Sequence, residues 1–193
     1  VPNREAYQPR IKRLGWQIVG VLPLLVNLGL PVGRSAAANL PAAEALTGSH
    51  RLIDDAMLAP GEAWRQRWSL EKLAWRASNP LRQVWVHRLD DVAALVSQEK
   101  IKSIPLSVVL KTFRTPRAGT VSLGPLIDAI RRFHHTPVIA YVGFHEGLSF
   151  PGITVPIKFR PSPLYLGQRL FDPELNPNNF RIDCFEAFDY DLF

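Results

Sequence analysis

The dipeptide His145-Glu146 is a candidate for acid–base chemistry. It follows an apolar run, 137–142, and glycines flank it on both sides. Loops that follow the strands of α/β sheets often carry active sites, and an imidazole beside a carboxylate can transfer protons. A zinc protease is excluded, because position 149 is serine where the HExxH motif needs its second histidine. A small hydrolase or transferase that uses His145 and Glu146 is therefore one open alternative.

The other chemically reactive residues indicate little catalysis. Cys184 is the only cysteine, which excludes an intrachain disulfide and a four-cysteine metal site. It follows Asp183, and neighbouring acids raise the pKa of a thiol, so we do not expect a reactive thiolate. The P-loop, GxGxxG, GxSxG and EF-hand patterns are all missing from the sequence. We therefore expect no metal and no cofactor.

Two groups of side chains are candidates for binding. A set of cations in the middle of the chain could hold phosphate, anionic lipid or glycan, or could be solvated individually. Three tryptophans at helical spacing predict a stripe on a helix over 62–78, which either packs on a sheet or lies at a membrane interface. The cations are Lys111, Arg114, Arg117, Arg131 and Arg132, and the tryptophans are Trp64, Trp68 and Trp75.

The net charge of +6 is unevenly distributed along the 193 residues. It is +4 over 1–34, +7 over 35–169 and −5 over 170–193. Without the first 38 residues the net charge would be only +2. A basic total normally suggests nucleic acid, but this distribution does not, and we expect no nucleic-acid partner.

The head of the chain has the parts of a targeting segment. Basic residues precede an uncharged, largely apolar run over 14–33, and Ala36 and Ala38 follow at the spacing of a signal-peptidase site. The sequence therefore predicts that 1–38 is a signal peptide or a membrane anchor. Either places the remainder outside the cytoplasm. An uncleaved helix over 14–33 would instead suit an accessory subunit of a membrane complex.

The last segment, 170–193, is acidic and rich in aromatic residues. Disordered acidic tails are rarely so aromatic, so we expect this tail to dock. It either folds back on the basic middle of the same chain or binds a basic groove of a partner.

The remaining pattern predicts a linker over 39–61, with one short helix near 42–46, and an α/β domain over 62–169. The alternation of elements favours an α/β or α+β fold with a small mixed sheet and flanking helices, preceded by the apolar head helix. The expected elements are helices over 62–78, 90–100 and 126–134 and strands over 83–87, 105–113, 137–142 and 153–159.

Taken together, these patterns favour an exported or membrane-anchored envelope protein without enzymatic activity. Its role would be binding or assembly, with a protein partner or a membrane surface as its target.

Overall fold

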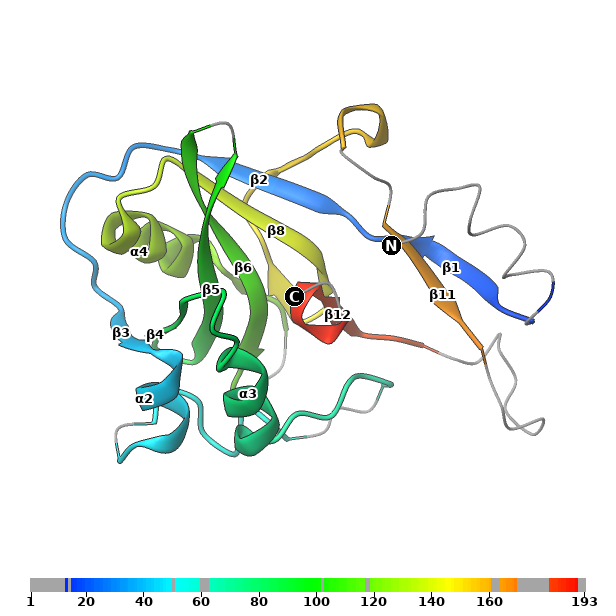
Figure 1. The fold of residues 1–193 in the computed structure, drawn as a ribbon, viewed down its shortest axis with the longest axis horizontal. Coiled ribbons are helices and arrows are strands. Elements are labelled where there is room, and N and C mark those ends of the chain that lie inside the picture. Colours follow the sequence, from blue (N-terminus) through cyan, green and yellow to red (C-terminus); the bar gives the residue numbers. More distant parts are fainter. Residues whose placement is uncertain are drawn as a thin grey trace.

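The structure is a computed structural model of the chain. It describes residues 13, 15–49, 51–59, 63–101, 103–116, 119–160, 164–169 and 181–190. The fold is a mixed α+β arrangement in which one large sheet dominates and few helices accompany it (Figure 1).

Eight of the described strands form the main sheet. Seven follow the order β10-β2-β8-β6-β5-β4-β3, and β12 pairs with β8 as an additional strand. The sheet is mixed, because β6 and β8 are parallel while the other neighbours are antiparallel. The strands are β2 Leu24–Leu28, β3 Ala38–Pro41, β4 Val84–Leu89, β5 Val92–Ile101, β6 Ile104–Arg114, β8 Val138–His145, β10 Ile153–Thr154 and β12 Cys184–Glu186.

The middle of the sheet confirms most of the predicted strands and corrects one helix. The strands expected over 83–87, 105–113 and 137–142 are β4, β6 and β8. The helix expected after Asp90 is wrong, since Asp90 lies in a tight turn at a φ of 52° and β5 follows it. The strand expected over 153–159 is shorter, but β10 does lie at the sheet edge, as the proline at 156 predicted.

Helices cover both faces of the sheet. One apolar core lies between the sheet and α2 (Ala42–Thr47) and α3 (Leu70–Ala77), and the other lies between the sheet and α4 (Gly124–His134). Helices α2 and α4 confirm two predictions. The helix expected over 62–78 begins only at Leu70, where Ser69 accepts a hydrogen bond from the backbone of Lys72 as an N-cap.

The apolar head forms strands where a helix was expected. Strand β1 (Gln17–Val21) pairs with β11 (Tyr165–Gln168), and β2 pairs with β8 inside the main sheet. The predicted helix over 14–33 is therefore wrong for the described residues. Pro23 separates the two strands, and valine and isoleucine suit an extended backbone. Among the described residues, no helix combines the length and apolar character needed to cross a bilayer.

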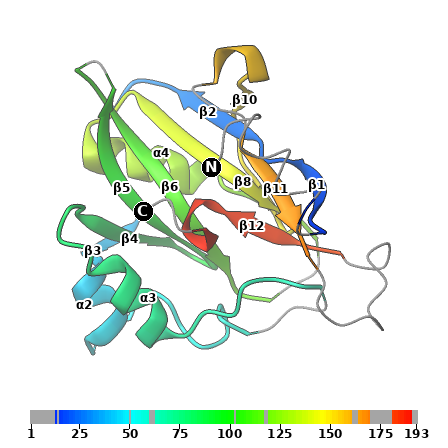
Figure 2. The ribbon, with the colours of Figure 1, turned by 45° about the vertical axis from the view of Figure 1, so that its right-hand side comes forward.

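The described part of the tail, residues 181–190, folds back onto the sheet of the same chain, which was one of the two expected alternatives. Strand β12 pairs with β8, and a short 3-10 helix, η3 (Ala187–Asp189), follows it (Figure 2). Gly143 permits this approach, because a Cβ there would lie 2.2 Å from the carbonyl oxygen of Phe185, and its φ is 120°. The remaining short elements are β7 Val121–Ser122, β9 Leu148–Ser149 and η1 Ile157–Phe159.

Candidate functional site

The densest cluster of ionisable groups lies where β6, β8 and β12 meet. Lys111 of β6 lies with its side chain only 5% exposed, and the carboxylates of Glu186 and Asp189 face it from β12 and η3. The lysine nitrogen Nζ lies 3.0 Å from Glu186 Oε2 and 2.7 Å from Asp189 Oδ2. It also donates to Cys184 Sγ at 3.2 Å. We call these four residues the Lys111 cluster.

The carboxylate of Glu186 is fully buried and well supplied with donors. Oε1 accepts hydrogen bonds from the hydroxyls of Thr112 and Tyr141. Oε2 accepts from the backbone N–H of Thr112 and from the Cys184 thiol, in addition to Lys111. Buried charges of this kind are tolerated when they are paired and hydrogen-bonded, so the cluster fastens the tail to the sheet.

The electrostatics of the cluster agree with this closed arrangement. Burial would raise the pKa of Glu186, but Lys111 and the hydrogen bonds hold that pKa below its usual value. Burial would likewise lower the pKa of Lys111, but the facing acids raise it above its usual value. Burial raises the pKa of the Cys184 thiol, and Glu186 raises it further. The predicted absence of a reactive thiolate therefore agrees with the structure.

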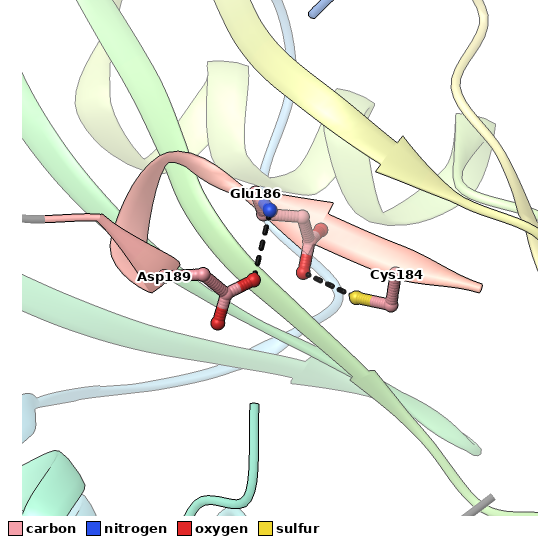
Figure 3. Close-up of side chains that lie close together, drawn as sticks. All are labelled: Cys184, Glu186 and Asp189. Carbon is pink, nitrogen blue, oxygen red and sulfur yellow. Dashed lines mark hydrogen bonds between the residues drawn. The ribbon is translucent and has the colours of Figure 1, made fainter. Parts of the chain in front are cut away.

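Three groups of the cluster could ligate a metal ion by their chemistry. Ligand atoms of Cys184, Glu186 and Asp189 lie within 4.8 Å of one another (Figure 3). However, the ammonium group of Lys111 contacts all three of them. The chain thus supplies its own cation at the position that a metal ion would take, and these residues do not fit a metal centre.

A small pocket borders the Lys111 cluster. Its volume is about 40 Å³, which is room for roughly three water molecules. Lys111, His145 and Cys184 line it, together with Arg65 and Arg114. Among the described residues no hydrogen bond joins Cys184 to His145, and His145 Nδ1 instead accepts from the backbone of Gly147 at 3.1 Å. The pocket therefore lacks the thiol–imidazole hydrogen bond of a cysteine nucleophile.

The two members of the predicted acid–base pair face different surroundings. His145 ends β8 and does not lie in a loop, and burial lowers its pKa. Glu146 forms an exposed ion pair with Arg181, with the shortest contact at 2.6 Å. Its carboxylate is thus engaged with the tail and not with His145.

No protein-family model, curated protein or solved structure matches this chain.

The structure does not bring the predicted basic set together. Lys111 lies in the buried cluster, whereas Arg131 and Arg132 belong to α4 on the opposite face of the sheet. Arg131 is buried and donates to Asp128 and Asn27, and Arg114 donates to two backbone carbonyls near the pocket. Arg117 lies outside the described residues.

The tryptophans do not form the expected stripe. Trp64 and Trp68 precede the helix, and Trp75 lies on α3 with 76% of its surface exposed. Trp64 forms a backbone bridge with Ile182, whereas Trp68 donates to Asp189 at 2.8 Å and packs against Phe188. Two of the three tryptophans therefore help to hold the tail.

Sequence reasoning missed a buried histidine pair. His87 of β4 and His134 of α4 approach with their Nε2 atoms 2.9 Å apart. The side-chain nitrogen of Asn39 donates to the carbonyl of Ala37. The side-chain oxygen of Asn39 therefore accepts a hydrogen bond from His87 Nδ1 at 2.5 Å. His87 Nε2 is then the acceptor and His134 Nε2 the donor. The only sequence signal was a histidine at a helix end, which predicted dipole complementation.

The histidine pair makes stability depend on pH. Burial and the neighbouring His134 lower the pKa of His87 to about 3, and burial lowers that of His134 to about 4. Unfolded histidines bind protons near pH 6.5. Between pH 6.5 and 4 the unfolded chain therefore binds more protons, and the stability present above pH 6.5 is lost as the pH falls.

We expect the melting temperature to fall as the pH is lowered from 7 to 4, while both imidazoles of the folded protein stay neutral at pH 5. Proton NMR of the histidine rings checks this, with the variants His87→Gln and His134→Gln providing the assignment. Titration of either ring near pH 6.5 in the folded protein would contradict it.

Proposed function

We propose that this chain is a binding domain without enzymatic activity that contacts its target through one lobe, which the head forms together with a later segment. The lobe consists of residues 15–34, 150–160 and 164–169 and contains β1, β2, β10, η1 and β11. In Figure 1 β1 and β11 extend beyond the main sheet, and Figure 2 shows them on the same side as β2 and β10. We call this region the acid-free lobe, because none of its residues is aspartate or glutamate.

One observation carries this proposal. Fourteen large apolar side chains are exposed among the described residues, and nine of them lie on the lobe. A concentration of exposed apolar groups on one region is typical of interaction surfaces. The nine are Trp16, Ile18, Val19, Leu28, Leu30, Val32, Ile153, Ile157 and Phe159.

The Lys111 cluster supports the binding role over the catalytic alternative. Lys111 and Cys184 have their polar atoms engaged within the protein, and the adjoining pocket holds only a few waters. His145 is the group left for chemistry there, and Glu146 is paired elsewhere. We therefore favour a binding function over a hydrolase or transferase function.

A location outside the cytoplasm, and a role as an accessory subunit of a membrane complex, stay predictions from the head sequence. N-terminal mass spectrometry of the native protein tests the predicted cleavage after Ala38.

We expect lobe substitutions to release the protein from its native assembly. Ile18→Asp and Phe159→Asp each place a charge where a large apolar side chain is exposed. In native gels of gently lysed cells, we expect the wild-type full chain to migrate with a larger assembly or with membranes, and both variants to migrate at the monomer position. Burying a carboxylate in an apolar contact is costly.

Leu81→Asp is the matched control, because Leu81 is 89% exposed and lies outside the lobe. We expect it to migrate as the wild type does. Wild-type migration of Ile18→Asp and Phe159→Asp would refute the proposed binding surface.

A further inference from the structure

We propose that the target of the acid-free lobe is an anionic lipid surface; this inference rests on the binding function proposed above. The first argument is charge. None of the 17 acidic residues lies in 6–43 or 147–171, while four basic residues lie in the first stretch and three in the second. The lobe is built from these two stretches, which lie far apart in sequence.

Strand pairing brings parts of these two stretches side by side. Strand β1 pairs with β11, and β2 pairs with β10. Arg160 links them further, because its guanidinium donates to the carbonyls of Leu22 at 2.7 Å and of Val155 at 2.8 Å. The lobe itself holds four basic residues, Arg34, Lys158, Arg160 and Arg169, and no acidic residue, so it carries +4 of the chain's net charge of +6 and has a positive potential.

The neighbouring acid does not cancel this potential. Asp128 of α4 approaches the lobe, since its partner Arg131 also donates to Asn27 of β2. Arg131 is paired with Asp128, so the two charges compensate each other. The cations Arg34 and Lys158 are exposed on the lobe, where the field of a membrane surface can act on them.

The second argument is how the apolar and basic groups alternate. In η1 the cation Lys158 lies between Ile157 and Phe159, and all three are exposed. The Lys158 ammonium lies 4.9 Å from the ring centre of Phe159. A long basic side chain can keep its charge among lipid headgroups while neighbouring apolar groups enter the acyl boundary.

The composition of the lobe favours lipid over nucleic acid. Seven of its nine exposed apolar residues are aliphatic, and only Trp16 and Phe159 are aromatic. Single-stranded nucleic acid is bound by aromatic stacking, and duplexes by phosphate contacts, so aliphatic groups would gain little from either. A lipid surface can bind both the apolar and the basic groups of the lobe, because the free energies of apolar insertion and of attraction to anionic headgroups add.

Vesicle sedimentation of the full chain tests this proposal. Vesicles of phosphatidylcholine are compared with vesicles of phosphatidylcholine mixed equally with phosphatidylglycerol. We expect the wild type to sediment with the anionic vesicles and much less with the neutral ones, and added salt to weaken this binding. Lys158→Glu should lower the partition coefficient by at least about fivefold, and Phe159→Ser by about tenfold.

Lys100→Glu and Leu81→Ser are matched controls, because both residues are exposed outside the lobe. We expect both to bind as the wild type does. Three results would overturn the lipid proposal: no sedimentation, equal binding to both vesicle types, or unchanged binding by the lobe variants. If Ile18→Asp and Phe159→Asp still leave the native assembly, the lobe binds a protein and only the lipid target is wrong. If they do not leave it, the proposed function fails as well.

Discussion

Replacing Lys111 with methionine is expected to destabilise the protein by about 3–5 kcal/mol, because two buried carboxylates lose their cation. Glu186 has no exposed surface, and both it and Asp189 contact the lysine nitrogen directly. Loss of this charge should detach β12 and η3 from the sheet. Trp68, which donates to Asp189 and packs on Phe188, reports this detachment by its fluorescence during urea unfolding.

Two further variants make the result specific. Lys158→Met removes an exposed lysine and should leave the urea midpoint unchanged. Lys111→Met combined with Glu186→Gln should be more stable than Lys111→Met alone, because the amide removes one unpaired buried charge. If Lys111→Met alone is as stable as the wild type, the Lys111 cluster does not hold the tail.

A chain that begins at Asn39 is expected not to fold. It lacks β1 and β2. One edge of β8 and the strands β10 and β11 thereby lose the strands with which they pair. It also lacks Asn27, which accepts from the buried guanidinium of Arg131, and the buried side chain of Leu22. Fully burying one large apolar side chain contributes about 1.5–3 kcal/mol. Because Leu24, Leu25 and Val26 of β2 are also half-buried, the combined loss approaches the lower end of the total stability of a typical domain, about 5–15 kcal/mol.

The matched control is a chain that begins at Gly15, which keeps every described strand. Circular dichroism and size-exclusion chromatography compare the two. A monomeric chain from Asn39 with wild-type circular dichroism would show that β2 is dispensable. If cleavage after Ala38 occurs in cells, it removes an inner strand of this sheet.

The sequence correctly predicted the elements whose hydrophobic pattern fits only one kind of secondary structure. The apolar run of β8 and the amphipathic pattern of α4 were predicted correctly. Strand β5 was not, because both of its faces are buried and its continuous apolar pattern also satisfies helical spacing. The head failed for the same reason, since an uncharged apolar run fits an inner strand as well as a helix.

The candidate site was predictable only in its local chemistry. The high pKa of the Cys184 thiol agrees with its acidic neighbourhood. The pairing of Lys111 with Glu186 depends on how β12 packs against β6 and β8, and the histidine pair depends on how α4 packs on β4. Such contacts between distant segments leave no spacing pattern in one sequence.

The late position of β12 has a consequence for how the chain folds during synthesis. Lys111 leaves the ribosome before either of its anionic partners, and β2 leaves it long before β8. The sheet therefore depends on contacts between distant segments, which slow folding and keep unpaired strand edges exposed in the meantime. The nascent chain holds an unneutralised lysine at a future core position until the tail arrives, so the pairing of that tail is a closing step of folding.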